Sequence, residues 1–134
     1  MALTKLTGLQ INDAVVIDDV AFVVNDENTD TINVELQLQA GGEDLDQVGV
    51  VQAYLSDAAT GIGVTATAPD GDIAIGTDGA ILGEMVADKV FLLQSEADGD
   101  IDLDIGEAAG GTWYLCVILP GGTIKVSGAI TFAA

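Results

Sequence analysis

The residues best suited to chemistry in this chain are the alternating acids of EADGDIDLDI, residues 96–105. A helix-loop-helix calcium loop needs oxygen ligands at its first, third and fifth positions, a glycine at the sixth and a glutamate at the twelfth. Counted from Asp98, the sixth and twelfth positions are Leu103 and Ala109, and a count from Asp100 fails in the same way. The spacing therefore does not fit this calcium loop.

The same stretch fits a β-strand with one apolar and one polar side. Successive side chains of a strand point to opposite faces, so Ile101, Leu103 and Ile105 would point one way and the aspartates the other. We expect a half-buried strand whose aspartates face solvent. A weak divalent-cation site of another geometry is the alternative.

A set of catalytic side chains is not recognisable. The chain has no histidine, its serines Ser56, Ser95 and Ser127 lie outside any nucleophile-elbow pattern, and no glycine pair precedes the Lys-Ser/Thr of a phosphate loop. Cys116 stands in the apolar run WYLCVIL, which predicts an inert packing group. As the single cysteine it forms no intrachain disulfide, which indicates synthesis in a reducing compartment. We expect no enzyme activity, no catalytic, cofactor-binding or metal-binding residue, and no cofactor.

The charge balance excludes some partners. Twenty-two acids stand against three lysines and no arginine, for a net charge of −19. Binding to phosphates depends on clustered cations, so nucleic acid and anionic membrane surfaces are not expected partners. No apolar run has the length of a membrane span and no secretory signal is recognised. A saline setting, a basic partner or simply a well-solvated surface accounts for the charge.

The rest of the sequence predicts short strands separated by turns. The 134 residues suffice for one domain, and 17 glycines with few aromatic residues favour a sheet over a helix bundle. Apolar or alternating runs predict strands at residues 31–39, 48–56, 73–76, 89–95, 100–105, 112–119 and 123–132. This spacing predicts an all-β fold, an antiparallel immunoglobulin-like β-sandwich of about seven strands over residues 31–134.

Residues 1–30 differ from the sandwich domain, because their apolar residues show no clear alternation. Two interpretations stay open for residues 1–30. One is an N-terminal arm that packs on a partner, with residues 1 to about 24 as the attachment part, and the other is extra strands at the sandwich edge. The segment before Asp13 contains no acid and a single lysine, which makes it the least acidic part of the chain.

Several stretches resemble the β-sandwich domain of head decoration and head-fibre proteins of tailed bacteriophages. The most specific part is TWYL, followed by a Pro-Gly turn and VSGAITF. The resemblance extends over AYLSDAATG (53–61), AIGTDG (74–79), LQSEADGDIDLDI (93–105) and GGTWYLCVILPGGTIKVSGAITF (110–132).

This resemblance implies a capsid decoration (cement) protein without catalytic activity. Such a protein would be made in the host cytoplasm and fixed on the outer capsid surface of the virion as a homo-oligomer, a trimer, with the major capsid protein as its partner. The capsid-contact candidates are the apolar residues and the lysine of the acid-free segment, Leu3, Lys5, Leu6, Leu9 and Ile11. The alternative is an adhesion module of a tail or fibre that binds a cell-surface glycan, with Tyr54 and Tyr114 as its candidate stacking aromatics.

Overall fold

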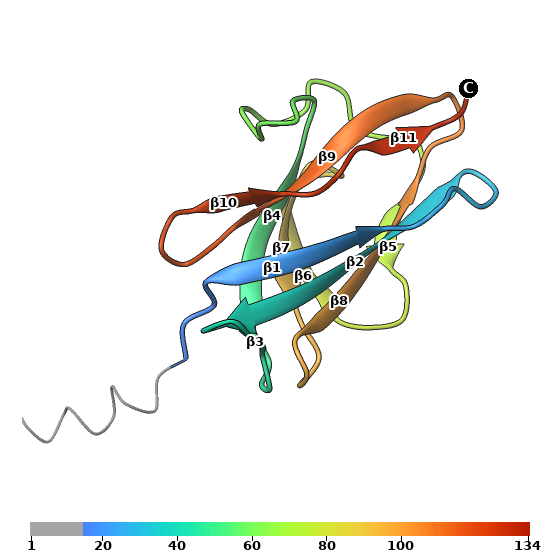
Figure 1. Ribbon diagram of the computed structural model, residues 1–134. Helices are drawn as coiled ribbons and strands as arrows, with labels where there is room; N and C mark the ends of the chain where they lie inside the picture. Colours follow the sequence, from blue (N-terminus) through green and yellow to red (C-terminus); the bar gives the residue numbers. More distant parts are fainter. Residues whose placement is uncertain (1–14) are drawn as a thin grey trace, which may run out of the picture.

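The computed structural model describes residues 15–134, and these form two antiparallel sheets packed face to face (Figure 1). Sheet A has the strand order β1-β2-β8-β5, with β3 also paired to β2. Its strands are β1 Asp19–Val24, β2 Thr31–Ala40, β3 Glu43–Asp44, β5 Ile73–Ile75 and β8 Asp100–Gly106. The structure confirms the expected all-β sandwich, and its immunoglobulin-like type stays a prediction.

Sheet B has the strand order β10-β9-β4-β7-β6, and β11 also pairs with β9. Its strands are β4 Val50–Ser56, β6 Ala80–Val86, β7 Val90–Gln94, β9 Gly111–Ile118, β10 Ile124–Val126 and β11 Ile130–Phe132. In Figure 1 the described chain begins beside β3, at the end of the sandwich opposite to the C-terminus.

The core lies between the sheets and consists of the inward-facing residues of both. Sheet A contributes Ile32 to Leu38 of β2 and Ile101 to Ile105 of β8 at every second position, and all of these side chains are nearly inaccessible. Sheet B contributes apolar residues of β4, β7 and β9, and Trp113 of β9 packs edge-on against Phe132 with ring centroids 6.0 Å apart. Burial of these aliphatic side chains is the main stabilising term of the fold.

Residues 15–134 form eleven strands where the sequence predicts about seven, and local irregularities explain the difference. The run at 123–132 divides into β10 and β11 at Ser127, whose hydroxyl accepts a hydrogen bond from the Leu115 amide (2.9 Å). Strand β6 pairs with β7 through two register shifts, so its apolar residues do not alternate along the sequence. The short β3 contributes two ladder pairs to β2.

Residues 19–24, which lie in the N-terminal segment, form the edge strand β1. Each of its six residues pairs with β2, from Asp19 opposite Gln39 to Val24 opposite Val34. Ile17, just before β1, is buried against the core. This part of the segment therefore belongs to the sandwich, and an attachment arm reaching to residue 24 is not compatible with the observed pairing.

Candidate interaction surfaces

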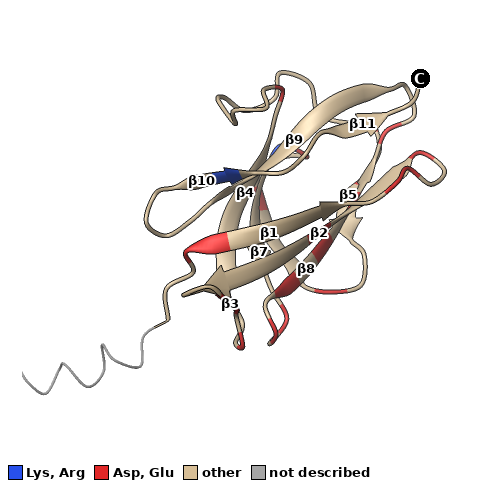
Figure 2. Ribbon diagram, in the orientation of Figure 1, with Lys and Arg blue, Asp and Glu red and all other residues tan. Residues whose placement is uncertain are grey.

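The capsid-contact candidates Leu3, Lys5, Leu6, Leu9 and Ile11 lie outside the described residues. The other predicted features fall on the two outer faces of the sandwich, which differ in chemistry. The strands of sheet A carry most of the strand carboxylates, whereas β4, β7, β9 and β11 of sheet B carry none. Figure 2 shows this difference as acidic colouring on β8 and at the start of β1, while β9 is uncharged.

The outer face of sheet A is an acidic surface built on β2 and β8. Asp100, Asp102 and Asp104 of β8 point away from the core, as the alternation predicts. Across the strand pair, Asp102 lies opposite Glu35 and Asp104 lies opposite Asn33. Like charges opposite each other in a sheet repel. The carboxylates of this face therefore destabilise the fold unless hydrogen-bond donors offset their repulsion.

Asp102 is the exception to the expected solvent-facing aspartates, because it is only 9% exposed. Its carboxylate accepts hydrogen bonds from the Thr77 amide (2.7 Å), the Asp78 amide (3.4 Å) and the Asn33 side chain (3.3 Å). The turn after β5 therefore lies over this carboxylate and covers it. The expectation of a solvated Asp102 is wrong, because a segment distant in sequence takes the place of water.

Two other aspartates on this side have altered acidity. Partial burial and the nearby carboxylates of Asp102, Asp98 and Glu96 raise the pKa of Asp78. Partial burial, together with Asp98, also raises the pKa of Asp100. Both shifts have the same sign because neither carboxylate has a cation beside it that would favour ionisation.

Part of the acidic surface lines an open groove of about 710 Å³. The acids along it come from the β3 region, the turn before β6 and the start of β8, and they are Asp44, Asp46, Asp78, Glu96, Asp98 and Asp100. Within residues 15–134, however, no three acids, cysteines or histidines converge as a metal-binding group.

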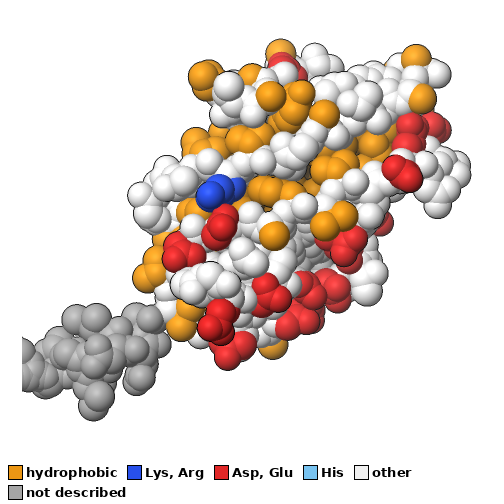
Figure 3. Space-filling view, in the orientation of Figure 1, with side chains coloured by type: hydrophobic (Ala, Val, Ile, Leu, Met, Phe, Trp, Pro, Cys, Tyr) orange, Lys and Arg blue, Asp and Glu red, His pale blue; other side chains and the backbone are white. Residues whose placement is uncertain are grey.

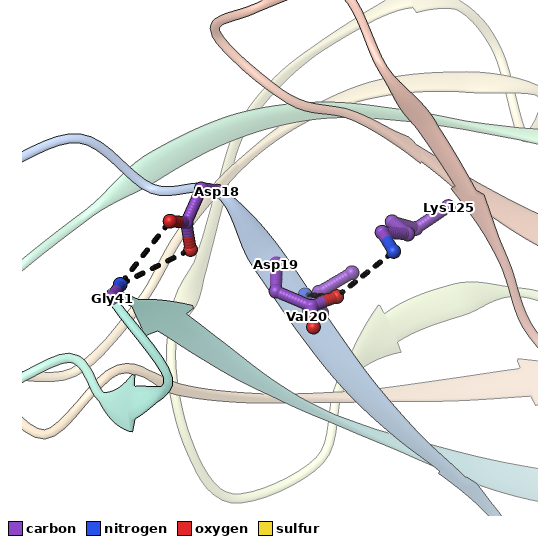
Figure 4. A network of polar contacts seen from close by, with 5 residues as sticks. All are labelled: Asp18, Asp19, Val20, Gly41 and Lys125. Atoms are coloured by element: carbon purple, nitrogen blue, oxygen red, sulfur yellow. Dashed lines mark hydrogen bonds and ion pairs between the residues drawn. The ribbon is translucent and has the colours of Figure 1, made fainter.

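The edges of the two sheets meet at an exposed ion pair, shown in Figure 4. Lys125 of β10 lies opposite the inward-facing Val117, and its ammonium group reaches Asp19 of β1 at 3.3 Å. The Val20 amide and Lys125 both lower the pKa of Asp19. Asp18 beside it accepts from the Gly41 amide at 3.2 and 3.3 Å, which ties the start of β1 to the turn after β2.

The outer face of sheet B carries a second apolar cluster, separate from the core. Tyr54, Val90 and Cys116 are buried there, and Ile118 and Val126 pack against them. Burial raises the pKa of the Cys116 thiol, as is typical of an unreactive cysteine in apolar surroundings. The packing role expected for Cys116 agrees with its complete burial.

The segment after β4 folds back over this cluster and covers part of it. The Tyr54 hydroxyl donates to the Gly61 carbonyl, and the Ser56 hydroxyl donates to the Ile62 carbonyl (3.3 Å). A Cβ atom at Gly61 would lie 2.9 Å from Val126 and 3.2 Å from the Cys116 sulfur, so only glycine allows this close crossing.

This packing removes Tyr54 from the candidates for glycan stacking. Its side chain is 7% exposed and its hydroxyl is committed to Gly61, so the prediction of an exposed ring at this position is wrong. Tyr114 is half-buried. A sugar platform needs an accessible aromatic face, and neither tyrosine of the chain is fully exposed.

The three serines also have structural partners. Each is buried, and the hydroxyls of Ser95 and Ser127 donate to the carbonyls of Glu96 and Gly128 at 2.8 Å. The same hydroxyls accept from backbone amides, of Gly49 in the case of Ser95. These hydroxyl groups therefore replace backbone hydrogen bonds at strand ends.

Sequence reasoning missed the uncharged outer face of sheet B. The uniformly apolar run at 48–56 predicts a more buried strand, but Val50 is 43% exposed, and Ile118 at the end of the run at 112–119 is half-buried. The absence of charged residues could have indicated this uncharged face, since neither run contains an acid or a base although the chain carries 22 acids.

Comparison with family models, curated proteins and solved structures finds no match to this chain. In the part of the chain that the structure covers, no helix has the length and apolar character needed to cross a membrane.

Proposed function

We propose that this protein is a structural, non-enzymatic capsid decoration protein that binds the outer surface of a bacteriophage head and stabilises it. Its partner is the major capsid protein, and it acts on the virion as a homo-oligomer, a trimer. The resemblance of the stretches at 53–61, 74–79, 93–105 and 110–132 to phage decoration domains is one support for this proposal.

The observation that carries the proposal is the unequal distribution of charge over the sandwich. A protein fixed on a particle has one side in contact with its neighbours and another in water. Asp100 and Asp104 of β8 give sheet A a hydrated outer face, and β4, β7, β9, β10 and β11 of sheet B carry no carboxylates. This division suits a protein that presents one side to solvent and packs through the other parts of its surface.

The N-terminal residues 1–14 are the proposed attachment arm. All 22 acids lie from Asp13 onward, so the arm is nearly free of the charge that repels other acidic surfaces. Its leucines gain roughly 25 cal/mol for each Å² of apolar area buried on a partner. Several arms on one oligomer would add avidity to weak single contacts. Since β1 begins at Asp19, the arm ends before the sandwich.

The test mixes purified protein with phage heads that lack it and measures bound protein by sedimentation. Deletion of residues 2–14 should leave the cooperative melt unchanged, because the β1–β2 pairing is retained, and should weaken head binding at least about tenfold. A variant with Leu3, Leu6 and Leu9 changed to serine tests the apolar contribution, and Lys5→Gln tests the charge. Val23→Ser is the matched control, because Val23 is an exposed apolar residue on the sandwich itself.

Three outcomes separate the parts of the proposal. Undiminished binding of the truncated protein would show that the sandwich, not the arm, contacts the head. Failure of the full chain to bind heads, with antibody against it labelling tails in electron micrographs, would refute the capsid role. Binding that falls with both the deletion and the leucine variant supports the arm.

A further inference from the structure

The outer face of sheet B has no acid or base on β4, β7 or β9, and it carries exposed apolar side chains around the buried cluster of Tyr54, Val90 and Cys116. Two cross-strand rows form it, and their members are Val126, Cys116, Tyr54, Val90 and Val86 in one row and Ile124, Ile118, Gln52 and Leu92 in the other. The charged residues on the strands of this sheet are Glu84 and Lys125. Glu84 pairs with Phe91 and Lys125 with Val117, and both partners face the core. Paired residues point to the same side, so Lys125 does not lie on the outer face. Glu84 is exposed beside a register shift of the edge strand β6, at the opposite edge of the sheet from β10.

A fixed loop adds a protruding side chain to this surface. Ile62 is 79% exposed, and its own carbonyl accepts from Ser56 while the preceding Gly61 is bonded to Tyr54. The Cβ position of Gly61 lies 3.5 Å from a methyl group of Ile124, which is itself 44% exposed. Ile124 therefore lies beside the backbone of the loop that carries Ile62, and both residues are exposed.

The charge of the molecule indicates what covers this face. A basic partner would bind better to the acidic face of sheet A, so the absence of carboxylates on sheet B gives it no advantage. A carboxylate-free surface is required where the partner is itself acidic. The acidic partner present wherever this chain is made is another copy, with the same charge of −19.

Figure 3 shows how charged and apolar side chains are distributed over one side of the molecule. Carboxylates gather over the sheet A half of the molecule, and apolar side chains lie along the side of β9 to β11. Contact between two sheet A faces would place Asp100, Asp104 and Glu35 of one copy against the same residues of another. Such like-charge contacts oppose association.

We propose that copies of this chain associate through the outer face of sheet B, with Ile62 and Ile124 in the buried part of the interface. Apolar contact supplies the attraction, and repulsion between the acidic faces opposes it over a longer range. Salt shortens that range, from about 10 Å at 0.1 M to about 3 Å at 1 M. Association through this face therefore strengthens as salt is added, whereas contact between opposite charges would weaken.

The test measures the mass of the purified full chain by sedimentation velocity over a concentration series, in about 0.1 M and about 1 M sodium chloride. The wild type should form a defined oligomer of the 13.6 kDa chain, with a lower dissociation constant in the higher salt. Ile62→Glu and Ile124→Glu should each raise the dissociation constant at least about 100-fold, because an interface that excludes water does not accommodate an unpaired charge.

Val23→Glu is the matched control, because Val23 is 53% exposed on the outer face of sheet A. It should associate like the wild type, and circular dichroism melts should show all three variants folded. A wild type that stays monomeric in both salt conditions would overturn the proposal, as would equal loss of association in Val23→Glu and Ile62→Glu. Loss of association on deletion of residues 2–14, with Ile62→Glu unaffected, would assign self-association to the N-terminal segment instead. The proposal rests on the homo-oligomer of the proposed function. Because no capsid is used, its failure is distinguishable from a failure of capsid binding.

Discussion

On each outer face of the sandwich a loop is held in place, and the two faces hold it by different chemistry. Each sheet has a loop that folds over its outer face and is fixed there by a buried side chain. On sheet A that side chain is Asp102, whose carboxylate holds the turn after β5 by hydrogen bonds to Thr77 and Asp78. On sheet B it is Tyr54, which lies in an apolar cluster and holds the segment at Gly61.

The difference shows which properties of a strand belong to the fold and which are available for function. The inward residues of both sheets are buried and apolar, mostly aliphatic, with the aromatic Phe91, Trp113 and Phe132 on sheet B. The outward residues are not determined by the core, so one face can be acidic and the other apolar. Surface chemistry on such a sandwich is therefore informative about its partners.

The largest effect is expected at the anchor of the acidic face. Asp102→Ala removes the carboxylate that accepts from the Thr77 amide and the Asn33 side chain. Because these partly buried donors then lack that acceptor, the free energy of unfolding should fall by about 2–3 kcal/mol. Urea denaturation measures this loss. Asp100→Ala, on the same strand and face, is the control and should not destabilise the protein. Equal losses in the two variants would mean that the burial of Asp102 has no structural value.

The buried thiol tests the apolar face in the same way. Cys116→Ala should cost about 1 kcal/mol through the small cavity it leaves, and Cys116→Ser should cost about 2 kcal/mol because its hydroxyl is buried among Tyr54, Val126 and their neighbours. Thermal denaturation gives both values. A thiol reagent should label the native protein only as fast as it unfolds, since Cys116 is inaccessible. Rapid labelling of the folded protein would show that the loop at Gly61 does not cover this face.

The sequence predicts the inward-facing side chains of each sheet better than the outward-facing ones. The alternation in β8 correctly places Ile101, Leu103 and Ile105 in the core, because burial on one face is a local pattern of period two. The burial of Asp102 was not predictable in this way, because its hydrogen-bond partners lie at Asn33 and Thr77. Contacts between distant segments leave no pattern in a single stretch of sequence.

Strands with irregular pairing were also missed. The run AILGEMV of β6 contains two register shifts, one between Ile81 and Gly83, so its apolar residues fall on both faces. The dipeptide Asp70-Gly71 predicts a turn with a positive-φ glycine, and it does lie between strands. Gly71 does not adopt a positive φ, and it is glycine because a Cβ atom would lie 2.7 Å from the backbone of Gly106.

A smaller effect is expected from the charge repulsion on the acidic face. The raised pKa of Asp100 means that the folded protein binds this proton more tightly than the unfolded chain. The associated stability is fully present below the ordinary pKa of 3.8 and is lost as the pH rises through the folded-state pKa. Asp100→Asn should therefore be more stable than the wild type at neutral pH, by at most about 0.5 kcal/mol because water screens this exposed site.

Urea denaturation at a series of pH values checks this prediction. The difference between Asp100→Asn and the wild type should disappear below pH 3.8, where the carboxyl group is protonated in both the folded and the unfolded state. It should also shrink in about 1 M salt. A variant less stable than the wild type at neutral pH would show that the Asp100 carboxylate stabilises the acidic face.

The smallest effect is expected where the edges of the two sheets meet. The ion pair of Lys125 and Asp19 is solvent-exposed, so Lys125→Gln should change the melting temperature at neutral pH by little more than the error of measurement. The lowered pKa of Asp19 determines how the contribution of this ion pair to stability changes with pH. Its contribution is present above the ordinary pKa of 3.8 and is lost as the pH falls through the lower folded-state value, which is opposite to the behaviour of Asp100. Thermal melts of Lys125→Gln and the wild type should therefore converge at low pH and in high salt. A loss as large as that of Asp102→Ala would mean that the edge contact, and not the shared core, holds the acidic and apolar sheets together.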